Sequence, residues 1–276
     1  MYSRPVSDLT PERDEWMRRM GPFYPGLVAL CALTVVPLPR GLTPTREDML
    51  RGAKWFPAVG AASGIALAIL CELLLWFGLS PAVVALLLVP ASLAMTGTGL
   101  LLATASTVDD LVSRDRARGL DALGTHGTLA LIGLLAVRVV ALMSASPDEW
   151  GMALFFSEVI SYWSVLFLLY IGDLLDEPDI RDRVFLAVGP ISLPALGVGS
   201  GVAGGAVIVA LWLSGAVVLL ATLLAAAIAF ALGVLFQRKM GGVSNRSLAT
   251  IACLCGLLVL LAFSAAHPAT VSPWIG

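Results

Sequence analysis

The sequence predicts an all-α, polytopic membrane protein, a bundle of about seven transmembrane helices that follows a short N-terminal re-entrant or interfacial helix. Of its 276 residues, 58% are hydrophobic and 13% are charged, whereas soluble domains carry about 25% charged residues. The mean hydropathy is +0.92, and several apolar runs reach the roughly 20 residues that cross a hydrocarbon core of about 30 Å. These observations exclude an ordinary soluble domain, a disordered chain, a disulfide scaffold, a coiled coil and a β-barrel porin.

The apolar runs divide the chain, a single integral membrane domain of residues 1–276, into a polar start and a series of crossings. Residues 1–20 form a polar segment that we place in the cytoplasm. Residues 21–36 are apolar but have basic residues on both sides and prolines at their end, so we expect them to enter or lie along one leaflet without crossing. We expect the seven crossings at about 57–77, 81–105, 127–145, 151–171, 184–213, 216–236 and 247–266.

The positive charges support this topology. The chain has 17 Lys and Arg residues, and every one except Arg138 falls in the N-terminal segments or in loops on one side of the membrane. The other side keeps short connections, whose charges are Asp148 and Glu149. Because Lys and Arg collect on the cytoplasmic side, we expect a multi-pass inner-membrane protein with a cytoplasmic N-terminus and a periplasmic C-terminus.

Three ionisable residues fall inside the predicted spans: Glu72, Arg138 and Glu158. A charge at such depth costs roughly 2.5 kcal/mol or more and usually faces a partner or a wet cavity. Arg138 and Glu158 lie at similar depth on consecutive antiparallel spans, so we expect them to pair. The pair either holds the bundle together or contacts a substrate.

Carboxylates are frequent in the loops on the basic side. The first such loop contains Asp109, Asp110, Asp115 and Asp121, and Asp109 and Asp110 are candidate metal ligands, because one or two carboxylates plus phosphate oxygens commonly hold Mg²⁺. A solvated loop that mixes acidic residues with arginines is the alternative. The same alternatives apply to the second acidic loop, with Asp173, Asp176, Glu177, Asp179 and Asp182.

Gly124-Thr125-His126-Gly127 opens the third predicted span. Free backbone N–H groups at a helix N-terminus favour anions, so Gly124, Thr125 and His126 are candidate substrate-binding residues for a phosphate, as is Arg138. A plain turn explains the glycines equally well, with His126 as a turn residue.

Small residues in the spans predict packing. Gly60 to Gly64 and Gly197 to Gly205 have small residues at four-residue spacing, which lets membrane helices approach closely. The cysteines lie in apolar runs without metal-ligand spacing, so we interpret them as small core residues: Cys31, Cys71, Cys253 and Cys255.

Several segments, in the same order, resemble one family, cobalamin-5′-phosphate synthase, also called adenosylcobinamide-GDP ribazoletransferase. Residues 33–39, L-T-V-V-P-L-P, resemble its early F-L-T-R-[IL]-P-[VL]-P, and residues 55–60, W-F-P-A-V-G, its [WY]-F-P-L-V-G. Thr96-Gly97 and residues 107–111, T-V-D-D-L, fall where the family has T-G-G-x-H-x-D-G-L-A-D-T-A-D-G-L. The last two matches are residues 124–127 with G-T-[FHY]-G and residues 240–244 with L-G-G-x-T-G-D.

The resemblance implies a polytopic membrane enzyme that joins α-ribazole or its phosphate to adenosylcobinamide-GDP and releases GMP, with Mg²⁺ as cofactor. In such a phosphoryl transfer, carboxylates would hold Mg²⁺ over the pyrophosphate while a ribose hydroxyl attacks.

This chain departs from the family at polar positions. Leu100 stands at the family's histidine, and Leu102 and Ser106 at its first two aspartates, so that Asp109 alone keeps a carboxylate of that motif. Asn245 and Arg246 replace the late G-D pair. The early arginine is Val35, and Asp121 lies one place out of register with the family's D-S-R-[IV].

Two main hypotheses follow. In the first, the chain is an active, divergent transferase with a corrinoid nucleotide substrate. Asp109 and Asp110 are then the candidate catalytic residues, and Asp109 and Asp110 hold the metal together with Asp121 or the carboxylates of residues 173–182. In the second, it is a catalytically degenerate relative that serves as an accessory or binding subunit, with a homo-oligomer or membrane complex as its partner. A transporter or unrelated bundle that uses Arg138 and Glu158 is a third alternative. Under all three hypotheses we expect the chain to contact the lipid bilayer and to have no nucleic-acid partner.

Overall fold

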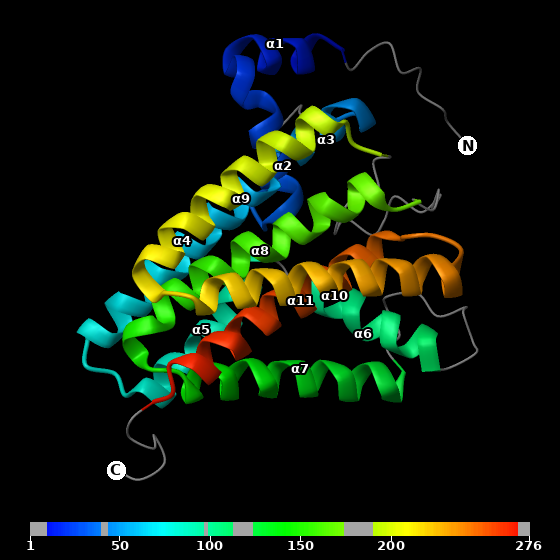
Figure 1. Cartoon of the computed structure of the whole chain (residues 1–276). Helices are drawn as coiled ribbons and strands as arrows, with labels where there is room; N and C mark the ends of the chain where they lie inside the picture. The colour runs from blue at the N-terminus through cyan, green and yellow to red at the C-terminus, as the bar shows by residue number, and fades with distance from the viewer. Residues whose placement is uncertain (1–9, 40–43, 97–98, 113–123, 174–189, 270–276) are drawn as a thin grey trace.

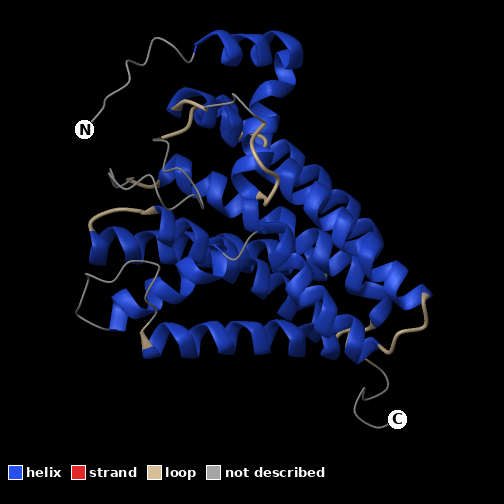
Figure 2. Cartoon of the chain, turned by 180° about the vertical axis from the view of Figure 1, so that it is seen from behind, coloured by secondary structure: helices blue, strands red, loops and turns tan. Residues whose placement is uncertain are grey.

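The computed structural model describes residues 10–39, 44–96, 99–112, 124–173 and 190–269. These residues form helices and connecting segments, with no β-strand among them (Figure 2), so the predicted all-α class is confirmed. The helices are α1 (Thr10–Met20), η2 (Gly21–Phe23), α2 (Tyr24–Leu33), α3 (Arg46–Ala53), α4 (Phe56–Trp76), α5 (Pro81–Thr96), α6 (Gly99–Val112), α7 (Thr125–Ser144), η3 (Pro147–Glu149), α8 (Trp150–Ile171), α9 (Leu193–Ser214), α10 (Val217–Met240) and α11 (Asn245–Ala266) (Figure 1).

Within the described residues, six helices are long and apolar enough to cross a membrane, namely α4 and α7 to α11. The pair of α5 and α6 is a seventh candidate span if the two helices are counted together, but they are bent by 89° relative to each other. The single helix predicted over 81–105 is therefore wrong in this detail. Its sequence contains Thr96-Gly97-Thr98-Gly99, four residues of poor helix propensity, which an average of hydropathy does not register.

The N-terminal segment does not cross. Helix α2 has ten residues and a length of about 15 Å, half of what a crossing requires. It packs against α3 and α4, and α1 to α3 lie together at the top of Figure 1. Helix α9 begins at Leu193, with Pro194 in its first turn; residues 184–189 of the predicted 184–213 span lie outside the described residues.

Helices α8 and α11 form the centre of the bundle. Their most apolar windows are 78% and 67% buried, compared with 22–33% for the other four single-helix spans. Helix α4 lies close along α8, because a Cβ added at Gly60 would come within 2.6 Å of the Glu158 carbonyl oxygen, and one at Gly64 within 2.6 Å of the Phe155 Cα. The predicted close approach is therefore confirmed for Gly60 and Gly64.

The other glycine run is divided. Gly199 is buried, and a Cβ added there would collide with the Leu166 side chain and lie 3.1 Å from the Lys54 carbonyl oxygen, so the predicted close approach is confirmed at this residue. A Cβ added at Gly197, Gly201, Gly204 or Gly205 would meet open space. The side of α9 that these residues form thus faces away from the bundle. The cysteines are free thiols, and Cys71, Cys253 and Cys255 are buried as expected, while Cys31 is partly exposed.

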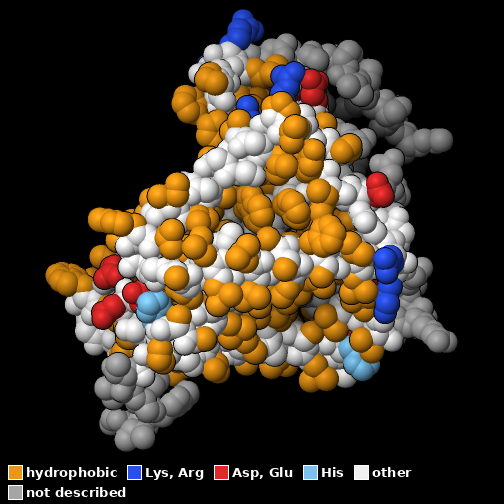
Figure 3. Space-filling view, viewed as in Figure 1, with side chains coloured by type: hydrophobic (Ala, Val, Ile, Leu, Met, Phe, Trp, Pro, Cys, Tyr) orange, Lys and Arg blue, Asp and Glu red, His pale blue; other side chains and the backbone are white. Residues whose placement is uncertain are grey.

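The helix ends collect at two opposite ends of the bundle. At one end the Ser146 N–H donates to the His267 carbonyl at 2.8 Å, and the Ser214 hydroxyl to Glu149 at 2.7 Å. At the other end, the Val243 N–H donates to the Asp173 carbonyl at 2.7 Å. On the face in Figure 3, Lys and Arg lie at the upper and right edges together with some acidic residues, whereas the lower left shows acidic residues without Lys or Arg, and a hydrophobic surface lies between. Which end faces the cytoplasm stays a prediction of the charge distribution.

Candidate functional site

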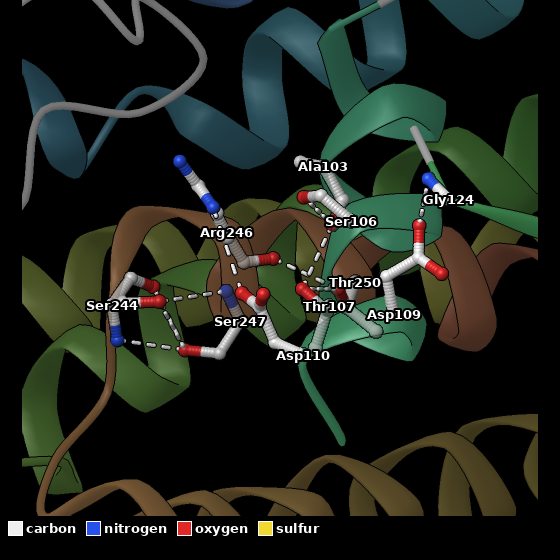
Figure 4. Close-up of polar contacts among 10 residues, drawn as sticks. All are labelled: Ala103, Ser106, Thr107, Asp109, Asp110, Gly124, Ser244, Arg246, Ser247 and Thr250. Atoms are coloured by element: carbon white, nitrogen blue, oxygen red, sulfur yellow. Dashed lines mark hydrogen bonds and ion pairs between the residues drawn. The ribbon is translucent and has the colours of Figure 1, made fainter. Parts of the chain in front are cut away.

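Three segments that are distant in sequence meet at the basic end of the bundle (Figure 4). They are the last turns of α6, the first turn of α7 and the first turn of α11. Helix α6 packs against both of the other helices. Side chains from these turns form the polar junction, which we define as Thr107, Asp109, Asp110, residues 124–127, residues 244–247 and Thr250.

Asp109 closes the N-terminus of α7. Its Oδ2 accepts a hydrogen bond from the Gly124 N–H at 2.6 Å, and its Oδ1 one from the Gly127 N–H at 2.8 Å. The Asp109 residue is 9% exposed. The first N–H groups of a helix lack partners within it and carry partial positive charge, so the carboxylate supplies both missing acceptors and a complementary charge.

The two glycines of the 124–127 segment make this contact possible. A Cβ on Gly127 would collide with the Asp109 carboxylate and come within 2.7 Å of the Ala105 carbonyl oxygen. A Cβ on Gly124 would lie 2.8 Å from Asp109 Oδ1. The sequence predicted an anion at this N-terminus; in the structure an anion from the chain itself, Asp109, occupies it. Thr125 and His126 are exposed beside it.

Asp110 points to a different neighbour. Its Oδ2 lies 3.5 Å from Nη1 of Arg246, and the two side chains are 16% and 23% exposed, respectively. The Thr250 hydroxyl approaches the Thr107 hydroxyl at 3.0 Å and ties α11 to α6. Sequence reasoning singled out Arg246 only as a departure from a family motif and missed it as a member of the site.

The first turn of α11 is held by its own cap. The Ser244 side chain accepts from the Ser247 N–H, and the Ser247 side chain from the Ser244 N–H, which forms a capping box. This cap fixes the backbone from which Asn245 and Arg246 project. Within the described part of the chain, the buried Asn245 Oδ1 has no hydrogen-bond partner.

The described residues do not by themselves make a magnesium site. Consecutive residues on a helix are about 100° apart, and Asp109 and Asp110 accordingly face α7 and α11 (Figure 4). No group of three His, Cys, Asp or Glu residues suited to a metal occurs within the described ranges. Asp121, and Asp176 to Asp182 in the second acidic loop, lie outside those ranges, so the predicted Asp109, Asp110 and Asp121 set stays a prediction.

Arg138 and Glu158 lie elsewhere, in the body of the bundle. Arg138 is thirteen residues beyond Thr125 on α7, which corresponds to about 20 Å along the helix. Glu158 is buried on α8, and both residues line the same two small cavities. In the described part of the chain no ion pair within 4.0 Å joins them, although their charges are close enough to interact. Arg138 therefore does not join the polar junction. The expected direct ion pair of Arg138 with Glu158 does not form among the described residues, although the two residues line the same cavities.

Comparisons with known proteins point to one family. The family model described as cobalamin-5-phosphate synthase matches residues 26–265. An adenosylcobinamide-GDP ribazoletransferase of Geotalea daltonii (strain DSM 22248 / JCM 15807 / FRC-32) is 33% identical over 144 residues, which cover 50% of this chain and 58% of that protein. The chain thus matches just over half the length of this relative. No solved structure matches the chain.

Proposed function

Because the chain belongs to the cobalamin-5-phosphate synthase family, we propose that it is a divergent adenosylcobinamide-GDP ribazoletransferase-like membrane enzyme. It joins α-ribazole or its phosphate to adenosylcobinamide-GDP and releases GMP. The observation that carries the proposal is the polar junction, in which three of the segments that resemble family motifs, 107–111, 124–127 and 240–246, meet at one end of the bundle.

The proposed reaction forms a bond from an oxygen of α-ribazole to the phosphorus on the corrinoid side of the pyrophosphate. The bond from that phosphorus to the bridging oxygen breaks, GMP leaves with the electron pair of this bond, and the proton of the attacking ribose hydroxyl is released to water. The pyrophosphate is strongly anionic, so its binding requires positive charge and hydrogen-bond donors. Arg246 supplies a partly exposed guanidinium, oriented by Asp110, and the exposed Thr125 and His126 supply side chains at the start of α7.

In this proposal Asp109 and Asp110 have different roles. Asp109 positions α7, through its two hydrogen bonds to backbone N–H groups. Asp110, which is less enclosed, stays the candidate catalytic and metal-binding carboxylate. The Mg²⁺ that the family resemblance implies belongs to this proposal, with Asp121 as a further candidate ligand.

The distribution of basic residues supports a cytoplasmic location for the proposed reaction. The junction lies at the end of the bundle that carries Arg238, Lys239 and Arg246. Under the positive-inside rule this end faces the cytoplasm of an inner-membrane protein. A charged nucleotide substrate would then reach the site without crossing the bilayer.

The test is release of GMP by the purified protein in detergent, given adenosylcobinamide-GDP, α-ribazole phosphate and Mg²⁺. We expect GMP from the wild type and a loss of at least about tenfold in Asp110→Asn, which keeps the shape of the side chain and removes its charge. Asp148→Asn, at an exposed residue of η3 at the other end of the bundle, is the matched charge control and should leave the rate unchanged. Asp109→Ala is a poorer probe of chemistry, because it also releases α7.

A specific observation favours a second candidate, a catalytically degenerate relative that acts as an accessory or binding subunit. Both oxygens of Asp109 bond to α7, and Asp110 faces an arginine where the family has a carboxylate. Under this alternative no GMP appears, and mild solubilisation recovers the chain with stoichiometric copies of itself or of partner chains. The two outcomes distinguish the candidates directly.

A further inference from the structure

Arg138 and Glu158 meet at two cavities inside the membrane-spanning part of the bundle. Each cavity has a volume of about 10 Å³, which is roughly the room that one water molecule requires. The first is also lined by Ser92 and Ser157, and the second by Thr96 and Ser161. Polar side chains of three helices thus converge on a small space at membrane depth.

The hydrogen-bonding capacity of this lining is one-sided. The Ser92 hydroxyl donates to the Val89 carbonyl at 2.8 Å, the Ser161 hydroxyl to the Ser157 carbonyl at 2.8 Å. The single proton of each of these two hydroxyls is therefore already in a hydrogen bond, so that toward the cavity each hydroxyl can act only as an acceptor. The Glu158 carboxylate adds further acceptors. The buried Arg138 Nε is a donor without a hydrogen-bond partner among the residues that the structure describes.

The donors and acceptors that line the two cavities indicate which kind of molecule can bind there. An apolar group would leave the Arg138 N–H and the Glu158 carboxylate unsatisfied at a cost. A cation would be repelled by the Arg138 guanidinium, and an anion would be repelled by the Glu158 carboxylate. A small neutral molecule that both donates and accepts satisfies all of them, and a water needs two to four such partners.

The break between α5 and α6 lies at the same place. Thr96 at the end of α5 and Leu100 and Leu101 at the start of α6 line the second cavity.

We propose that Arg138, Glu158 and the surrounding serine and threonine hydroxyls form an intramembrane binding site for ordered water molecules, which bridge the guanidinium and the carboxylate beside the α5–α6 break. The site couples α7, which packs on α5, α6 and α11, to the central helix α8. It is a different site from the polar junction and does not depend on the proposed enzyme activity.

Two cysteines of α11 offer a matched test. Cys253 lines the second cavity, whereas Cys255, two residues further along, donates to the Ala225 carbonyl at 3.5 Å and lines neither cavity. Two variants would keep one of these cysteines each, with the other three changed to alanine. Transfer into D₂O is then followed by the infrared S–H and S–D stretching bands. A third variant that retains the buried Cys71 is a second control.

We expect the Cys253 thiol to exchange at least tenfold faster than those of Cys255 and Cys71. Equal rates for all three would overturn the proposal. A crystal structure of the wild-type chain that resolves ordered water is the second measurement, because it needs no substitution. Density in both cavities within hydrogen-bond distance of Arg138 Nε and Glu158 supports the site; empty cavities, or a direct Arg138–Glu158 contact, would overturn it.

Discussion

Removal of the Asp109 carboxylate should destabilise the protein through α7. Asp109→Ala deletes two short hydrogen bonds from backbone N–H groups, at 2.6 and 2.8 Å. Hydrogen bonds to a charged group contribute about 1.5–3 kcal/mol each, and water that enters the vacated space recovers part of this. We therefore expect a loss of roughly 3–5 kcal/mol in the free energy of unfolding.

The assay is thermal unfolding in detergent, followed by tryptophan fluorescence from the chain's 7 tryptophans. In a chain of this size, 1 kcal/mol shifts Tm by about 2–4 °C, so Asp109→Ala should lower Tm by roughly 10 °C. Asp109→Asn keeps one acceptor oxygen and should fall between the alanine variant and the wild type.

The neighbouring residue provides the control. Asp110→Ala removes a partly exposed ion pair at 3.5 Å, which contributes about 0–1 kcal/mol, and Tm should fall by no more than about 3 °C. If Asp109→Ala lowered Tm no more than Asp110→Ala does, Asp109 would not be the cap of α7, and its oxygens would again be candidate metal ligands.

Three further predictions concern the same end of the bundle. Gly127→Ala should lower the free energy of unfolding by about 1–3 kcal/mol or more through overpacking, because its Cβ would clash with Asp109 and Ala105. In the same thermal assay the control Gly133→Ala should be neutral or slightly stabilising, because a Cβ at Gly133 would lie in open space. A double-mutant cycle of Asp110→Ala and Arg246→Ala should give a coupling free energy of about 0.5–1 kcal/mol, and a value of zero would mean that the pair does not orient Arg246. In a chain whose native cysteines are replaced, Thr125→Cys should react with an impermeant thiol reagent in inverted membrane vesicles and not in intact cells; the opposite pattern would reverse the topology.

The helical bundle could be predicted from the sequence, but the bend between α5 and α6 could not. Long apolar runs and one-sided basic loops located the spans, because both features act along the chain and need no tertiary contact. The bend between α5 and α6 depends on the local backbone preference of Thr96 to Gly99 and on the neighbours that accept the exposed helix ends. Mean hydropathy over a window does not contain that information.

Most residues of the candidate site could be identified from the sequence, but the contacts that they make with one another could not. Asp109 and the glycines of 124–127 were each identified, yet their contact joins residues 15 and 18 positions apart and depends on how closely α6 approaches α7. The Asp110–Arg246 pair joins the sixth and eleventh α-helices, so no local pattern points to it. Arg138 and Glu158 were correctly placed near one another, but depth along two helices does not reveal whether side chains touch or leave room for water.

The most direct test of the account compares the two orientations of the membrane. Adenosylcobinamide-GDP, α-ribazole phosphate and Mg²⁺ are added to sealed inverted vesicles and to sealed right-side-out vesicles that carry the overproduced chain, and released GMP is measured. We predict GMP from the inverted vesicles alone, because the polar junction lies at the end of the bundle that is assigned to the cytoplasm. Release by right-side-out vesicles alone, or by neither preparation, would contradict the account.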